Sequence, residues 1–342
     1  RREHQRDDVL HRMLDLWDER CAARGDAAKQ PMRPVIDASL PFPDVAPSSG
    51  LDVLCHRAEA TPDDPAFFTP AAIRAEEVHW KDGWISFPSP LPSDVEVNNT
   101  VRSSVVAGEE RGHALVVFHH WNARERSVRL ARYFAGKGIT VVQMAMPFHM
   151  ERRRPGAENV DDILSADLGR TLKSMRQAVL DGRAMVGILN NAGFERVSVL
   201  GMSLGSWVAG LVAAHDDRVG CAGLFLSAGS LADMAWTGRA TRHIRSSLDG
   251  VLELSQLRRA WAPLDLTRHA SKLARSSLTL QFVLAKRDTV VPSALSERLV
   301  ASVRQAGADP RVRWLDCGHY SLSLPPYILR AGHSMASALA DS

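Results

Sequence analysis

The stretch Gly201-Met202-Ser203-Leu204-Gly205 decides the fold of this chain, because it has the pattern Gly-x-Ser-x-Gly in a matching context. Residues 196–200 before it form a β-branched apolar run typical of a buried strand. Residues 206–214 after it are almost all apolar and predict a buried helix. A strand, a sharp turn and a helix in this order place a serine at a strained turn with small neighbours. The pattern therefore predicts that Ser203 is a catalytic nucleophile; an incidental glycine turn is the alternative.

A serine nucleophile needs a base, and the base needs a carboxylate that orients it. Two further apolar runs, residues 278–285 and 311–315, predict buried strands, and each runs into a suitable residue. Asp288 follows the first strand and His319 follows the second. The chain order serine, acid, histidine favours a triad of Ser203, Asp288 and His319. A helix cap or surface turn at Asp288 and a structural loop histidine at His319 are the alternatives.

With these three residues in this order, residues 76–342 resemble the α/β-hydrolase superfamily of serine esterases and lipases. The resemblance implies an α/β fold with a mostly parallel central sheet flanked by helices. It also implies an oxyanion hole built from the N–H of Leu204 and the N–H of Trp121, which lies in the loop after the predicted strand 114–118. His120 in that loop stands where many relatives have glycine, and a side chain there restricts the backbone.

A second acidic residue competes with Asp288, because some members of this fold carry the acid after an earlier strand. Asp265 lies in Pro263-Leu264-Asp265-Leu266, just before a predicted helix. A carboxylate in that position is typical of a helix cap. We therefore expect Asp265 to act on stability and Asp288 to act in the reaction.

Several residues near these loops are candidate substrate contacts. The expected pocket residues are His119, His120, His149, Met202 and Trp236. Residues 147–156, which include His149, are similar to the Pro-Tyr-His-Gly-x-Arg stretch of some dienelactone-hydrolase-like and acetyl-ester-hydrolase-like families, with Met150 in place of glycine. Adjacent histidines seldom converge on one ion and no acidic or cysteine cluster sits beside them, so neither a metal nor another cofactor is predicted.

Three consecutive arginines, Arg152, Arg153 and Arg154, occur in the same stretch. At the rim of the site they would attract an anionic substrate. Alternatively they form a solvated run that is paired with acidic neighbours such as Asp161 and Asp162. The sequence leaves both interpretations open.

Two segments are added to the predicted catalytic domain of residues 76–342. Residues 1–75 form an extension that begins with an amphipathic helix and continues as an irregular proline-rich segment. The apolar face of this helix consists of Val9, Leu10, Met13, Leu14, Trp17 and Cys21. It packs either on the core or on a second copy of the chain in a homo-oligomer. An insertion at residues 229–262, after the predicted strand 221–226, is expected to form a lid over the site.

The remaining patterns complete the predicted sheet. Residues 78–87 and 99–107 predict two antiparallel strands at its start, and residues 139–146 predict a further strand. Residues 163–189 predict one long helix. This helix supplies the crossover that two parallel strands require.

The composition fits a soluble globular enzyme: 342 residues, 45% hydrophobic and 24% charged. A net charge of +3 without a basic stripe argues against a nucleic-acid partner, and no apolar run is long enough to span a membrane. The four cysteines are scattered, which favours free thiols and a cytoplasmic protein. Because the chain begins at Arg1 and not at Met, a signal segment removed upstream stays open.

Together these features predict a serine hydrolase that cleaves a small-molecule carboxylic ester. An acyltransferase or a thioesterase on the same triad is one alternative. A catalytically inactive binding protein of this fold is another, since His120 and Met150 replace the usual glycines.

Overall fold

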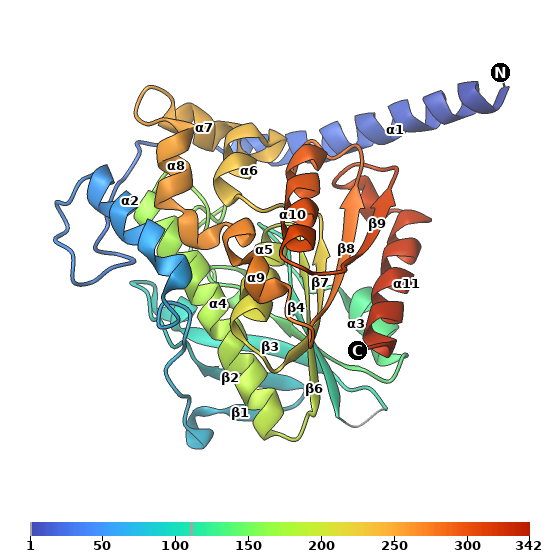
Figure 1. The fold of residues 1–342 in the computed structure, drawn as a ribbon, viewed down its shortest axis with the longest axis horizontal. Helices are drawn as coiled ribbons and strands as arrows, with labels where there is room; N and C mark the ends of the chain where they lie inside the picture. The colour runs from blue at the N-terminus through green and yellow to red at the C-terminus, as the bar shows by residue number, and fades with distance from the viewer. Residues whose placement is uncertain (1, 110–111) are drawn as a thin grey trace.

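The computed structural model describes residues 2–109 and 112–342. At its centre is a nine-stranded sheet with the order β1-β2-β3-β5-β4-β6-β7-β8-β9 (Figure 1). The strands are β1 His79–Lys81, β2 Trp84–Pro88, β3 Thr100–Val106, β4 His113–Phe118, β5 Thr140–Met144, β6 Arg196–Met202, β7 Val219–Phe225, β8 Thr279–Ala285 and β9 Arg311–Leu315. The pairs β1–β2, β2–β3 and β3–β5 are antiparallel. Every further pair along this order, from β5–β4 to β8–β9, is parallel. The predicted mostly parallel sheet is confirmed.

Helices cover both faces of the parallel part of the sheet, so its strands are buried on both sides. In β4, Leu115 and Val117 join the hydrophobic cluster on one face, and Val116 and Phe118 join the cluster on the other. The first face is covered by α3 (Val128–Ala135) and α11 (Tyr327–Ala340), and the second by α4 (Leu168–Asn191), α5 (Leu204–His215) and α10 (Ser293–Gln305).

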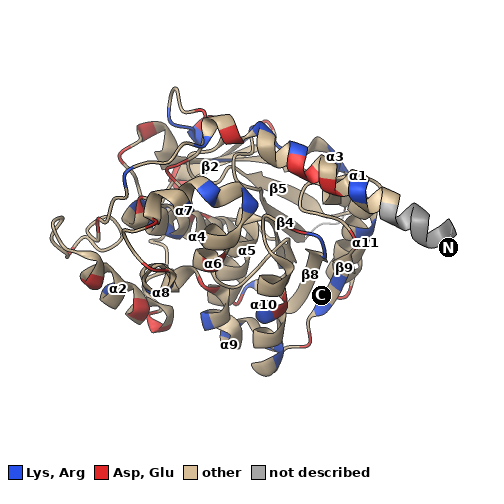
Figure 2. Ribbon diagram, turned by 90° about the horizontal axis from the view of Figure 1, so that it is seen from above, with Lys and Arg blue, Asp and Glu red and all other residues tan. Residues whose placement is uncertain are grey.

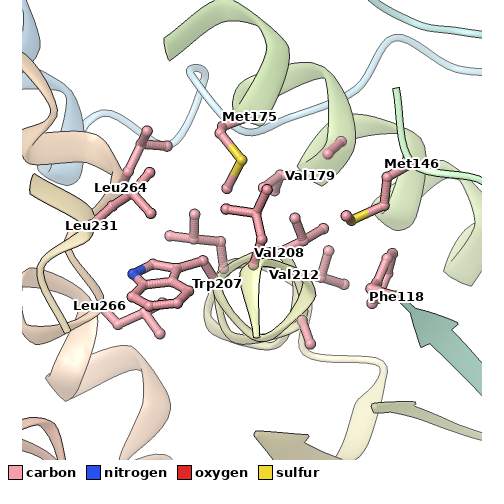
Figure 3. Packing of buried hydrophobic residues seen from close by; sticks show 14 of the residues in the cluster. Phe118, Met146, Met175, Val179, Trp207, Val208, Val212, Leu231, Leu264 and Leu266 are labelled. Carbon is pink, nitrogen blue, oxygen red and sulfur yellow. The ribbon is translucent and has the colours of Figure 1, made fainter. Parts of the chain in front are cut away.

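The larger cluster surrounds α5, the helix that follows Ser203. Trp207 of α5 is fully buried, and Figure 3 shows it beside Val208 with Met175 and Val179 of α4 above them. Its indole Nε1–H donates to the carbonyl of Gly229 at 2.9 Å, so the one polar atom of the side chain is satisfied. Burial of such a side chain contributes about 2–3 kcal/mol. The start of α5, and with it the turn at Ser203, is thereby held against the core.

Two predicted elements differ from the structure. The single strand predicted over residues 78–87 is a hairpin of β1 and β2, because Asp82 and Gly83 turn the chain with φ angles of 52° and 77°. Positive φ at both turn positions is typical of the tight Asp-Gly hairpin. The helix predicted from residue 163 begins at Leu168, where the Asp167 side chain accepts the N–H of Arg170 and caps it.

The N-terminal extension begins with α1 (Arg2–Arg24), which lies over the molecule and projects past the edge strand β9 (Figure 1). Leu14 is buried against the body of the protein. Val9, Leu10 and Met13 are 54%, 47% and 63% exposed. The predicted apolar face is therefore divided between a docked part and a free part. Self-association through the free part stays a prediction.

The rest of the extension and the insertion pack together. Phe42, Leu54 and Phe67 of the extension belong to the same hydrophobic cluster as the sheet and α5. The remaining α-helices are α2 Leu51–Ala60, α6 Leu231–Thr237, α7 Arg242–Leu248, α8 Leu254–Ala260 and α9 Ala270–Leu273, and α2 lies against α8. The short 3₁₀ turns include η1 Asp26–Ala28, η5 Met150–Arg152, η8 Leu266–His269 and η9 Ser321–Ser323. None of the described helices is long and apolar enough to cross a bilayer.

Candidate active site

Ser203 occupies the turn between β6 and α5 in a strained conformation, with φ 53° and ψ −122°. The glycines on either side are required by close backbone contacts. A Cβ at Gly201 would lie 2.1 Å from the carbonyl oxygen of Gly205, and a Cβ at Gly205 would lie 2.3 Å from that of Phe118. The two glycines of the Gly-x-Ser-x-Gly pattern are thus explained by the tightness of the turn, which leaves no room for a side chain at either position.

His319 and Asp288 meet at the ends of β9 and β8. The Nδ1–H of His319 donates to Asp288 Oδ2 at 2.7 Å, and both side chains are almost fully buried. The other carboxylate oxygen accepts the N–H groups of Val290 and Val291, each at 2.8 Å. These bonds fix the orientation of the carboxylate and place the lone pair of the neutral imidazole on Nε2. No hydrogen bond joins Ser203 Oγ to His319 in the described structure, although both residues line one cavity.

Asp265 has a different environment. Its Oδ1 accepts the N–H of Thr267 at 2.9 Å and the hydroxyl of the same residue at 2.7 Å. This is the cap of η8, the turn that follows. Burial raises the pKa of the Asp265 carboxyl. Its geometry agrees with the capping role expected for it.

The loop after β4 carries the amide proposed for the oxyanion hole. The positive φ in this loop is at Asn122, at 61°, and not at His120. Asparagine tolerates that conformation, so histidine in place of glycine causes no backbone conflict. Asn122 N–H donates to His149 Nε2 at 3.0 Å, and Asn122 Oδ1 accepts from Val160. The N–H of Trp121 has no acceptor among the described residues, and Leu204, as the first residue of α5, has no helical partner for its own N–H.

Two buried histidines hold this loop from below. His119 Nε2 accepts the N–H of Met146 at 3.0 Å, while its Nδ1–H donates to the carbonyl of His120 at 2.8 Å. The ring of His149 lies 4.6 Å from that of His119 in an edge-to-face arrangement. Burial lowers the pKa of His119 to about 3 and also lowers that of His149. Both rings are therefore neutral and act as acceptors for backbone amides.

A cavity of about 560 Å³ opens above Ser203 and His319. Loops at the carboxyl ends of the strands form one side of it, which we call the floor: the loops that carry Trp121, Ser203, Asp288 and His319. The opposite side, which we call the roof, is residues 17–29 of the N-terminal extension. The roof contributes Trp17, Cys21, Ala22, Arg24, Gly25, Ala28 and Lys29 to the lining. A second, more open hollow beside it lacks both Ser203 and His319.

Comparison with solved structures bears on the fold. Acetyl xylan esterase 1 from Thermoanaerobacterium sp. JW/SL YS485 aligns over 91% of this chain and 96% of its own, with a TM-score of 0.60 and 16% identity. An acetyl xylan esterase from Paenibacillus sp. R4 aligns over 88% of this chain and 98% of its own, with a TM-score of 0.57 and 14% identity. A puromycin-hydrolyzing peptidase of Mycobacterium tuberculosis aligns over 70% of this chain, with a TM-score of 0.52 and 17% identity.

The chain has the α/β-hydrolase fold. It spans 36% of the length of the mycobacterial peptidase, so that protein has a large part without a counterpart here. No family model and no curated protein sequence matches the chain. At these identities the likeness establishes the architecture, and the chemistry of this α/β-hydrolase fold has to be argued from its own residues.

The predicted substrate contacts fall into two groups in the structure. His120 and Met202 line the cavity, whereas His119, His149 and Trp236 are outside its lining. The two histidines are buried, and each accepts a backbone N–H. Trp236 lies in the insertion, where the Arg245 guanidinium is 5.3 Å from its ring centroid. Among the described residues of the insertion, Ala240 alone reaches the cavity.

The three arginines all bond to other groups of the protein, although only Arg152 is fully buried. Arg152 is fully buried and forms an ion pair with Asp181 at 2.8 Å. Arg154 bonds Asp162 at 2.9 Å, and Arg153 donates to the carbonyls of residues 157 and 158. None of the three lines the cavity above Ser203. Of the two interpretations, internal pairing is the one the structure supports.

The roof is a feature that the sequence patterns do not predict. Arg239 of the insertion binds Glu19 at 2.6 Å and Asp26 at 2.8 Å, so the insertion supports the extension. Asp18 Oδ1 accepts the N–H groups of Tyr320 at 2.6 Å and Ser321 at 3.2 Å, directly after His319. The only sequence signal for these contacts was the amphipathic pattern of the helix, which does not identify its partner.

Proposed function

We propose that this protein is a serine hydrolase that cleaves a carboxylic ester through an acyl-enzyme. The observation that carries the proposal is the strained Ser203, which shares a cavity with His319 while Asp288 fixes the tautomer of that histidine. A strained turn is stable only where the surrounding structure holds it, and such strain concentrates at functional sites.

In the proposed reaction, Ser203 Oγ attacks the acyl carbonyl and His319 Nε2 takes the serine proton. His319 then gives that proton to the leaving alkoxide, and water hydrolyses the acyl-enzyme by the same steps in reverse order. Asp288 stabilises the imidazolium that forms in between. Arg24, Arg124 and Glu158 are exposed at the mouth of the cavity, so water has access to the acyl group.

The unpaired amides support an oxyanion hole. The N–H groups of Leu204 and Trp121 are the candidate donors to the oxygen of the tetrahedral intermediate. His149 and Asn122 hold the Trp121 loop in place before substrate binds. Donors that are oriented in advance contribute about 3–4 kcal/mol each to stabilisation of the transition state.

The test combines a covalent label with turnover. A fluorophosphonate probe is expected to modify Ser203, and Ser203→Ala is expected to lose both the label and at least about a thousandfold in kcat on p-nitrophenyl esters. Ser246→Ala, a change of an exposed serine on α7, serves as the matched control and should keep both. Labelling of another residue with Ser203 unmodified would reject the assignment. Faster reaction with acyl-CoA substrates would redirect it to thioesters.

A further inference from the structure

The cavity above Ser203 has an excess of positive charge. Its charged lining consists of Arg24, Lys29 and Arg124, against the single carboxylate of Glu158. Arg24 and Arg124 are exposed at the rim, whereas Lys29 is half-buried. Of these three cations, Lys29 is therefore the one surrounded mostly by protein and least by solvent.

Among the residues that the structure describes, Lys29 has no counter-ion of its own. Its Nζ lies 5.0 Å from the ring centroid of Trp121 and makes no ion pair or hydrogen bond with the described residues. The two acids that act on it are already engaged. Asp26 is bound by Arg239 at 2.8 Å, and Asp161 accepts from Asn159. Burial lowers the pKa of Lys29, because the ammonium has lost water and the nearby acids compensate for only part of that loss.

The position of Lys29 is fixed by the roof that carries it. Its backbone N–H donates to the carbonyl of Asp26 at 3.0 Å, and Asp26 is itself held by Arg239. The ring beneath Lys29 belongs to Trp121, whose indole Nε1–H donates to Val160 at 2.9 Å. The ammonium thus lies over the residue whose backbone amide is the proposed oxyanion donor. A group that binds Lys29 would lie in the same cavity as Ser203.

We propose that Lys29 forms an anion-binding subsite, so that the substrate is an ester with a negatively charged group near the scissile bond. This inference rests on the serine hydrolase proposed above and names its substrate class. A carboxylate would supply the counter-ion that Lys29 lacks and would add a charge-assisted hydrogen bond. Arg24 and Arg124 at the rim would raise the rate of encounter with the same anion.

The experiment compares two esters of matched acyl length, the mono-p-nitrophenyl ester of glutaric acid and p-nitrophenyl pentanoate. The wild-type protein is expected to prefer the anionic ester in kcat/KM, and Lys29→Met to lower that preference about tenfold, mainly through KM. Lys29→Arg should retain it. Lys173→Met, which removes a half-buried lysine on α4 outside the cavity, should leave it unchanged. Added salt should reduce the preference in the wild type.

Equal loss of both esters in Lys29→Met would show that Lys29 only packs on Trp121 and would overturn the subsite. A wild-type preference for the neutral ester would overturn it as well. Binding of the anionic ester to Ser203→Ala, measured by calorimetry with and without Lys29→Met, separates this result from failure of the nucleophile assignment. Full turnover by Ser203→Ala would refute the serine mechanism, and the ratio of kcat/KM for the two esters in Lys29→Met would then still report on Lys29.

Discussion

The floor and the roof of the cavity are held by different interactions. The floor lies at the carboxyl ends of strands that are buried on both faces, and its loops are fixed by backbone hydrogen bonds such as those to Asp288 and His149. The roof and the part of α1 that precedes it are joined to the body by charged side chains. His11 binds Asp316 at 3.0 Å, Asp15 binds Arg287, and Arg239 binds two acids of the roof. Figure 2 shows charged residues along α1 and few on the central strands.

This difference between the floor and the roof indicates which of the two controls the reaction and which controls substrate binding. The floor needs close backbone packing to hold a strained serine, and a buried sheet provides it. The roof adds a cation and apolar surface to the cavity without taking part in the sheet. Exposed ion pairs are weakened by salt and are individually worth little. We therefore expect changes in the floor to abolish the reaction and changes in the roof to alter substrate binding.

The largest expected effect lies in the floor. Asp288→Asn should lower kcat by about a thousandfold or more, because an amide cannot hold the imidazole in the required tautomer. Asp265→Asn should leave kcat within about threefold and lower the free energy of unfolding by about 1 kcal/mol, as loss of a cap does. Parallel kinetics and urea unfolding measure both quantities. The reverse ranking in kcat would assign the acid of the triad to Asp265 and would leave Asp288 without a role in the reaction.

An intermediate effect is expected where roof and floor touch. A Cβ at Gly318 would lie 2.5 Å from Asp18 Cγ, so Gly318→Ala should push the roof away from the His319 loop. We expect kcat/KM to fall about tenfold, an amount equal to about 1.4 kcal/mol in the transition state.

The double variant sharpens this prediction. In an Asp18→Ala background the clash is absent, so adding Gly318→Ala should cost about twofold or less. Both variants should be measured at the same pH and salt concentration. Additive effects of the two changes would mean that Gly318 serves the loop itself and that the roof is not in contact with the reaction.

The smallest expected effect is a difference in acid stability between the buried core and the roof. Burial lowers the pKa of His113 to about 4, that of His119 to about 3 and that of His269 to about 4. The unfolded chain, with histidine pKa values near 6.5, takes up these protons first. The free energy of unfolding should therefore be maximal above pH of about 6.5 and should fall as the pH drops toward 4.

The roof should not share this loss. Arg239 lowers the pKa of Glu19 and of Asp26, so their ion pairs persist until the pH falls below the ordinary range of carboxyl groups. Urea unfolding at several pH values tests the core, and His113→Gln should make the pH slope shallower by up to about 1.4 kcal/mol per pH unit. His333→Gln, at an exposed position on α11, is the control. An unchanged slope in His113→Gln would show that buried His113 does not contribute to the pH dependence of the free energy of unfolding.

Much of the floor could be predicted from the sequence because its determinants are local. A continuous run of buried residues marks β4, and the close approach of Gly201 to Gly205 marks the turn at Ser203. Each of these features involves residues only a few positions apart in the sequence. The end of a strand can be located where its apolar run ends. The placement of Asp288 and His319 after β8 and β9 required only that parallel strands end at one edge of the sheet.

The sequence by itself thus determined the α/β architecture and the order of the candidate catalytic residues. Tertiary structure alone decided that His119 and His149 support the loop that carries Trp121, that Arg152 pairs with Asp181, and that residues 17–29 cover the cavity. The reason is sequence separation. Arg239 and Glu19 are 220 positions apart, and no periodic pattern records which of many surface charges a given arginine will meet. Such pairs form only after the sheet has brought distant segments together.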